Sequence, residues 1–179
     1  MINKLKLHPD LQCKGCITST CAENDLAATM DSRIPADSFV IIKVDSYYSS
    51  LKLCHTPPSI DCLIVLKCAD GQFVIYLVEL KNIKSPSGFD HSNIYGKFKT
   101  TLEDFMSQRF QDIFFDPHQR IKDIHLYFVS NPYRLTHISH KKEGTKMDKL
   151  LSHKPFKFRG IISDIKIKNE ISCPIIEGC

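Results

Sequence analysis

IDCLIVLKCADGQFVIYLVELK, residues 60–81, is the stretch that decides the fold of this 179-residue chain. It holds two runs rich in Val, Ile, Leu and Tyr, residues 60–68 and 72–81, which predict two strands joined by a three-residue loop. Such a loop favours a type I turn followed by a glycine in the left-handed conformation, and Gly71 stands at that position. The stretch therefore predicts a β-hairpin.

The loop also sets the register of the two strands. If Cys68 pairs with Gln72, the numbers of paired residues sum to 140, and Asp61 lies opposite Glu79. Opposed side chains point to one face, about 5 Å apart at their Cβ atoms. Lys81 shares that face because strand side chains alternate with a period of two. A two-residue loop would shift the sum to 141 and turn Asp61 away from Glu79.

Two carboxylates and one amine at the end of this hairpin leave a surplus negative charge. Both strands are nearly continuous apolar runs, which indicates burial on both faces, and buried charges are costly unless paired or metal-bound. A salt bridge to Lys81 is one interpretation. The other is a Mg²⁺ (or Mn²⁺) site formed by Asp61 and Glu79, with the Leu80 backbone carbonyl as a further oxygen. Because such an ion activates water, and Lys81 would orient that water or stabilise developing charge, the pattern favours phosphodiester hydrolysis.

Asp61 followed by Glu79-x-Lys81 on a hairpin resembles the active-site signature of the PD-(D/E)XK, or restriction-endonuclease-like, nuclease superfamily. The resemblance implies a core of helix, three-strand meander, helix and strand, with Asp61 and Glu79 as metal ligands and Lys81 in a catalytic role. The chain departs from the family's pattern at Ile60, where a proline is usual. Some members of the family take a third acid from an N-terminal helix, and Glu23 is the candidate for it here, although a surface position is the favoured expectation for Glu23.

The rest of the chain predicts an α/β fold that agrees with this core, built on a central mixed β-sheet. The predicted elements are a weak helix over 23–30, an antiparallel meander of strands over about 38–48, 60–68 and 72–81, a helix over about 92–114 and a strand over about 124–130. The length is that of a single domain, residues 1–179. It would carry a Cys-containing N-terminal segment, residues 1–37, and a basic C-terminal part, residues 134–168.

The composition is ordinary for a globular protein, with 42% hydrophobic and 25% charged residues. No apolar stretch approaches the roughly 18 residues that a membrane-spanning helix needs, and the start of the chain lacks the apolar run of a signal peptide. We therefore expect an intracellular, cytoplasmic protein without a membrane partner.

Basic residues gather in the second half of the chain. Residues 1–90 hold nine Lys or Arg against ten Asp or Glu, whereas residues 91–179 hold fifteen against ten. This distribution is typical of a protein that binds a phosphate backbone, and a solvated basic face is the alternative. The candidate contacts with DNA are Lys141, Lys142, Lys146, Lys149 and Lys154. Three polar residues at the exit of the last predicted strand are expected near the site: Ser130, Asn131 and Tyr133.

Eight cysteines are a high count for this length. Cys13-x-x-Cys16 has the spacing of a zinc or iron-sulfur half-site. Some CRISPR-associated and recombination nucleases of the superfamily bind an iron-sulfur cluster through cysteines from both ends of the domain. The corresponding set here would be Cys13, Cys16, Cys21 and Cys173, with the trio at the opposite end from the usual one. The favoured expectation is free thiols, with Cys62 and Cys68 as small core residues.

These features together predict a metal-dependent DNA endonuclease. The size and the resemblance favour a type II restriction enzyme that acts as a homodimer, and RNA stays open as a substrate. One alternative is a non-catalytic, cysteine-rich, zinc-binding nucleic-acid-binding module in which Asp61, Glu79 and Lys81 form a structural ion network. The other is an iron-sulfur nuclease of recombination or CRISPR type.

Overall fold

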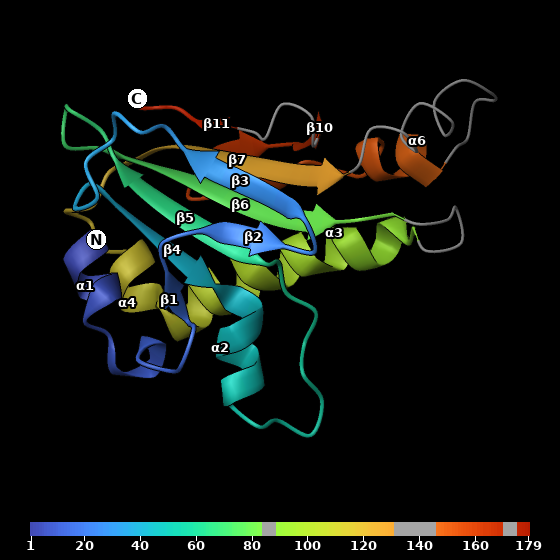
Figure 1. The fold of residues 1–179 in the computed structure, drawn as a ribbon, viewed down its shortest axis with the longest axis horizontal. Coiled ribbons are helices and arrows are strands. Elements are labelled where there is room, and N and C mark those ends of the chain that lie inside the picture. Colours follow the sequence, from blue (N-terminus) through green and yellow to red (C-terminus); the bar gives the residue numbers. More distant parts are fainter. Residues whose placement is uncertain (84–88, 131–145, 170–174) are drawn as a thin grey trace.

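A computed structural model describes residues 1–83, 89–130, 146–169 and 175–179 of the chain (Figure 1). A six-stranded sheet in the order β1-β4-β5-β6-β7-β10 forms the centre of this part. Its strands are β1 (Ile17–Thr18), β4 (Phe39–Lys43), β5 (Cys62–Lys67), β6 (Phe73–Lys81), β7 (Ile121–Ser130) and β10 (Ile165–Asn169). The first four strands in this order run antiparallel to one another, and β6, β7 and β10 run parallel. The predicted α/β class with a mixed central sheet is confirmed.

The β5–β6 hairpin has the predicted register. Leu63 pairs with Leu77 and Val65 pairs with Ile75, so the paired numbers sum to 140. Gly71 has a φ of 80°, which is the left-handed conformation that the three-residue loop requires. The slipped register with a sum of 141 is therefore wrong for this chain.

The strand predicted over residues 38–48 is wrong in its second half. β4 ends at Lys43, and the chain continues as α2 (Val44–Ser50). Val44, Tyr47 and Tyr48 are the buried residues of this helix. Their spacing of three and four residues is that of a helix face turned to a core, which explains why the chain leaves the sheet here.

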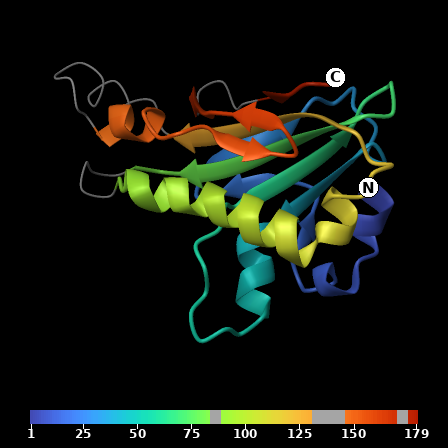
Figure 2. The same ribbon diagram turned by 180° about the vertical axis from the view of Figure 1, so that it is seen from behind.

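One long helical segment covers a face of the sheet, as Figure 2 shows. It consists of α3 (His91–Thr100), η3 (Thr101–Arg109) and α4 (Gln111–Phe114), where the sequence predicts a helix over about 92–114. The middle part is π-helical, with Phe110 N donating to Phe105 O over five residues at 3.0 Å. Aromatic side chains of this segment share a core with the hairpin residues Leu63 and Leu77. Two short N-terminal helices add to the same core: α1 (Ile2–Lys6) and η1 (Pro9–Leu11).

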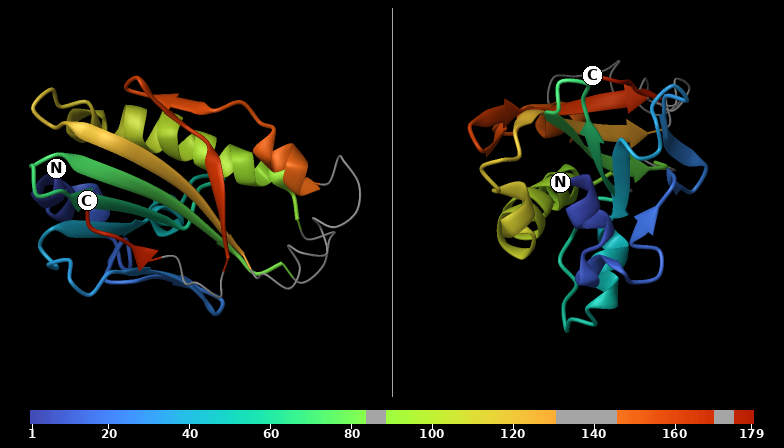
Figure 3. Two further views of the ribbon diagram at one scale, coloured as in Figure 1. Left: turned by 90° about the horizontal axis from the view of Figure 1, so that it is seen from above. Right: turned by 90° about the vertical axis from the view of Figure 1, so that its left-hand side faces the viewer.

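A small three-stranded sheet covers the opposite face, as both views in Figure 3 show. It consists of β2 (Cys21–Glu23), β3 (Leu26–Met30) and β11 (Ile175–Ile176). The helix predicted over residues 23–30 is therefore wrong. Asn24 and Asp25 have φ values of 47° and 69°, which are typical of the two-residue turn of a tight hairpin.

The C-terminal part adds elements that the sequence did not predict. These are α6 (Lys146–Leu151), β8 (Phe156–Phe158), β9 (Ile161–Ser163) and the edge strand β10. The strand predicted over about 124–130 is confirmed as β7, which begins three residues earlier, at Ile121. Among the helices of the described ranges, none has the length and apolar character needed to cross a membrane.

Candidate metal site

Asp61 and Glu79 meet where β5 begins and β6 ends. Asp61 directly precedes β5, and its Oδ2 accepts a hydrogen bond from the backbone N of Leu80 at 2.6 Å. Both carboxylates are buried: Asp61 is 5% exposed and Glu79 is 1% exposed. The predicted hairpin register thus brings the two acids to one place, although the strand ladder itself stops one residue short of them.

The cation that contacts Glu79 is Lys97, a residue that was not among the predicted site residues. Its Nζ lies 2.7 Å from Glu79 Oε1, and α3 carries it across from the helical face. Lys81, the predicted catalytic lysine, is half-buried at the same end of β6 and lines the same pocket. Its positive charge also lowers the pKa of the Glu79 carboxyl. The site therefore holds two lysines rather than one.

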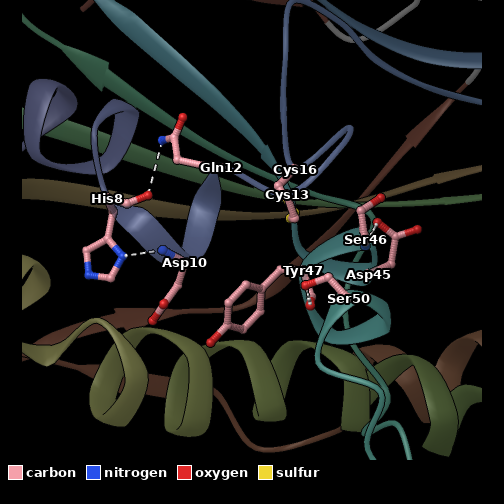
Figure 4. The surroundings of a disulfide bond; sticks show 9 residues. All are labelled: His8, Asp10, Gln12, Cys13, Cys16, Asp45, Ser46, Tyr47 and Ser50. Atoms are coloured by element: carbon pink, nitrogen blue, oxygen red, sulfur yellow. Dashed lines mark hydrogen bonds between the residues drawn. A yellow bond between two sulfur atoms is a disulfide. The ribbon is translucent and has the colours of Figure 1, made fainter.

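Two further acids come to the site from separate elements. Glu23 ends β2, and Asp45 lies in the first turn of α2, which begins beside the Cys13–Cys16 disulfide in Figure 4. One carboxylate oxygen of each, together with one of Asp61, lie within 4.8 Å of one another. Glu23 is exposed, as the expectation of a surface position had it. It lies on a strand rather than on a helix, and it lines the same pocket as Asp61 and Glu79.

These side chains line an open pocket of about 420 Å³. The turn between β2 and β3 forms one wall, the end of β6 forms another, and α3 contributes Lys97. The lining residues are Glu23, Asn24, Asp25, Asp61, Glu79, Leu80, Lys81, Asn82 and Lys97. Acids outnumber cations in this pocket, even before Asp45 is added.

Burial and mutual repulsion raise the pKa values of the two buried acids. Burial is the largest cause that raises the pKa of Asp61 far above its ordinary value, followed by the charge of Glu79 and a hydrogen bond with Glu23. Burial also raises the pKa of Glu79, against the opposing effect of Lys97. Burial disfavours the charge on Lys97, yet the neighbouring acids Glu79, Asp61 and Glu23 together outweigh burial, so the pKa of Lys97 is raised. Binding of a divalent cation would favour the charged carboxylates and displace the proton that Asp61 holds.

Glu79 Oε2 is the buried polar atom for which the described residues offer no hydrogen-bond partner. Its sister oxygen is bound to Lys97, so the carboxylate is half satisfied. Buried polar atoms nearly always have a partner, and the exceptions call for an explanation such as a missing ion or water. An all-oxygen set of carboxylates is what a hard divalent cation such as Mg²⁺ or Mn²⁺ prefers. The residues present therefore fit such an ion.

The cysteines are paired, which corrects the expectation of free thiols. Disulfide bonds join Cys13 to Cys16, Cys21 to Cys62 and Cys68 to Cys179, and Cys54 is the free cysteine of the described part. Cys21 lies with Cys62 rather than with the Cys13–Cys16 pair, so the structure does not gather the proposed zinc or iron-sulfur set. Cys173, its fourth member, lies outside the described residues.

Of the predicted DNA-contacting lysines, Lys149 and Lys154 are exposed. Lys146 begins α6, but its side chain lies outside the description, as do Lys141 and Lys142. Ser130 is near the site as expected, because its Oγ donates to the Lys81 carbonyl at 2.8 Å. The other two residues expected there, Asn131 and Tyr133, fall outside the described ranges.

Comparison with models of protein families, with curated proteins and with solved structures finds no match for this chain. A function is therefore inferred from the chemistry of the pocket itself.

Proposed function

We propose that the chain is a metal-dependent nuclease that hydrolyses phosphodiester bonds with Mg²⁺ or Mn²⁺ held by Asp61 and Glu79. The observation that carries the proposal is Glu79 Oε2, buried without a partner among the described residues at the wall of an acid-lined pocket. Leaving such an oxygen unpaired costs about 1–3 kcal/mol or more, and a bound cation would remove that cost. The Leu80 carbonyl is the proposed further ligand, and Glu23 and Asp45 lie where they can add to the set.

Each side chain of the pocket has a proposed task. A bound cation would polarise a phosphoryl oxygen and lower the pKa of a water. Leu80 N holds Asp61 in position through its hydrogen bond. Lys81, at the open end of β6, would orient the attacking water. Lys97 compensates the charge of Glu79 in the metal-free protein, and its ammonium would turn to a substrate phosphate oxygen once a cation takes that place.

DNA is the proposed substrate. This part of the proposal rests on the distribution of charge along the chain. The acidic pocket repels a polyanion until a metal and nearby basic groups offset its field. Lys149 and Lys154 are exposed in the basic C-terminal part and can contribute to that field. Three expectations stay predictions: that RNA can also be a substrate, that the chain is a type II restriction endonuclease, and that it acts as a homodimer.

The disulfides bear on the alternatives and on the location. A zinc or iron-sulfur centre needs thiolates, and the sulfurs of Cys13, Cys16 and Cys21 are bonded to other sulfurs. This weighs against the cysteine-rich zinc module and the iron-sulfur nuclease. Structural disulfides persist in oxidising compartments, so the three bonds also weigh against the expected cytoplasmic location, which stays a prediction.

Cleavage assays test the proposal directly. Purified protein is incubated with supercoiled plasmid and with single-stranded oligonucleotides in Mg²⁺, Mn²⁺ or EDTA. We expect metal-dependent cleavage that Asp61→Asn abolishes and Lys81→Ala slows about 10²- to 10³-fold. Glu103→Gln, at a side chain that is 65% exposed on the helical segment, is the matched control and should cleave normally. Metal-independent cleavage, or full activity in Asp61→Asn, would overturn the proposal, as would failure to cut any of these substrates.

A further inference from the structure

A disulfide joins two strands, β2 and β5, beside the candidate metal site. Cys21 lies two residues before Glu23 in β2, and Cys62 directly follows Asp61 at the start of β5. The two sulfurs are bonded to each other, and both residues are fully buried. The bond therefore ties the strand that carries Glu23 to the strand that follows Asp61.

The remaining attachments of Glu23 are noncovalent. They include the buried Leu26 and Ala28 of β3, which pack in the core, and the hydrogen bond with Asp61. β2 is three residues long and pairs with β3, not with a strand of the central sheet. Lys43 Nζ donates to the Ala22 carbonyl at 3.0 Å, a bond at the exposed surface. Glu23 itself is exposed. The covalent bond at Cys21 is thus the firmest restraint that holds this carboxylate near the site.

Electrostatics opposes this placement of Glu23 once the neighbouring acids lose their protons. Glu23, Asp45, Asp61 and Glu79 bring four carboxyl groups together, and like charges so close repel unless they are protonated or bound to a cation. Buried Asp61 and Glu79 cannot move away, because strands fix them. Glu23 sits at the tip of a two-stranded hairpin and can leave if the hairpin is released.

We infer that the Cys21–Cys62 disulfide makes cation binding at this site depend on oxidation, by holding Glu23 in place as an additional ligand. The inference rests on the proposed metal site and adds its regulation. In the reducing step a dithiol passes two electrons to the disulfide, which becomes two thiols with two protons, while the dithiol becomes a disulfide. The hairpin then loses its covalent anchor, and Glu23 moves away from Asp61.

Calorimetric titration with Mn²⁺ tests this inference on the full chain. Oxidised wild-type protein is compared with Cys21→Ser/Cys62→Ser, which lacks the bond. The matched control is Cys68→Ser/Cys179→Ser, which lacks the disulfide between buried Cys68, just past the far end of β5, and exposed Cys179. We expect a loss of at least about tenfold in Mn²⁺ affinity for the first variant and less than about threefold for the control, because loss of a supporting group costs about 10–100-fold.

Glu23→Gln separates a positioning effect from general destabilisation. In oxidised protein this single change should lower the Mn²⁺ affinity as much as loss of the disulfide does. Adding it to Cys21→Ser/Cys62→Ser should lower the affinity no further, because the carboxylate has already left. Thermal unfolding of each variant confirms that the compared samples are folded.

Several results would overturn the inference. Equal affinity of wild-type and Cys21→Ser/Cys62→Ser refutes the switch and leaves the metal site standing. Equal loss in both cysteine variants, or additive losses with Glu23→Gln, shows that the disulfide acts on stability alone. Absence of Mn²⁺ binding to the oxidised wild-type protein refutes the switch and the proposed function together.

Discussion

Glu79 and Lys97 form the ion pair on which the metal-free pocket depends. Glu79 is 1% exposed and the Lys97 side chain 23%, and their atoms are 2.7 Å apart. Breaking a buried pair by removing one partner leaves an uncompensated charge, which is far more costly than losing a surface pair. Lys97 should therefore contribute more to the free energy of unfolding than any lysine on the outer face of the same helix.

Lys97→Ala is expected to lower the free energy of unfolding at pH 8 by about 3 kcal/mol. The loss should shrink at pH 5, where Glu79 can take up a proton instead of standing charged. Lys99→Ala is the matched control, since this lysine is 55% exposed and lies 3.9 Å from an exposed Glu103; its effect should stay within about 0.5 kcal/mol. Urea denaturation measures both, and equal effects of the two variants would contradict the account.

The raised pKa of Asp61 predicts an unusual pH dependence of stability. The folded, metal-free protein keeps a proton on Asp61 that the unfolded chain gives up near the ordinary pKa of 3.8. The free energy of unfolding should therefore fall as the pH rises from 5 to 8. In Asp61→Asn this fall should be smaller. Parallel pH profiles of the two proteins would show that Asp61 is not protonated.

Residue identity at the site was predictable in part. Asp61, Glu79 and Lys81 follow from a local spacing, because one hairpin register relates them. Lys97 and Asp45 were missed, since no fixed sequence distance ties a helix residue to the strand that it faces. A signal for Asp45 exists, however: Val44, Tyr47 and Tyr48 have helical spacing, and recognising α2 would have placed an acid in its first turn.

Among the elements, the β5–β6 hairpin was predictable because its loop leaves little choice. Two long apolar runs and Gly71 define the pairing, and a slip by one residue would turn every side chain to the wrong face. The β2–β3 hairpin was missed, because strands of three and five residues carry no clear periodicity. Its turn residues Asn24 and Asp25 were the available signal, since both types tolerate positive φ.

The same substitution, Gly→Ala, should change the stability in opposite directions at two glycines that differ in backbone conformation. Gly71→Ala places a side chain at a φ of 80° and should destabilise the protein by about 1 kcal/mol, although no atom lies within 4 Å of the new Cβ. Gly96→Ala, in the middle of α3 with equally open space, should stabilise by about 0.5–1 kcal/mol. Thermal or urea unfolding measures both, and shifts of the same sign would contradict the assignment.

At the scale of the whole molecule, the strand order explains why the site can form. The antiparallel meander brings the start of β5 beside the end of β6, and the crossover through α3 to the parallel strand β7 lays a helix over that point. The sequence did not predict the N-terminal hairpin, the helix α2 inside the meander or the disulfides.

A metal ion that binds the folded state should stabilise the whole chain. At a free Mn²⁺ concentration one hundred times the dissociation constant, the gain is about 2.7 kcal/mol, which raises the melting temperature by several degrees. Glu79→Gln should be unaffected by Mn²⁺ under the same conditions. An equal rise in both proteins would place the bound metal elsewhere on the molecule.

The proposed function depends on a divalent cation that binds between Asp61 and Glu79. Anomalous scattering from a crystal of the oxidised protein grown with Mn²⁺ would locate that cation. We expect a manganese peak in this pocket, about 2.0–2.3 Å from oxygens of both carboxylates, with Lys97 Nζ moved away from Glu79. A pocket without manganese, in which Lys97 still contacts Glu79 at saturating Mn²⁺, would contradict it.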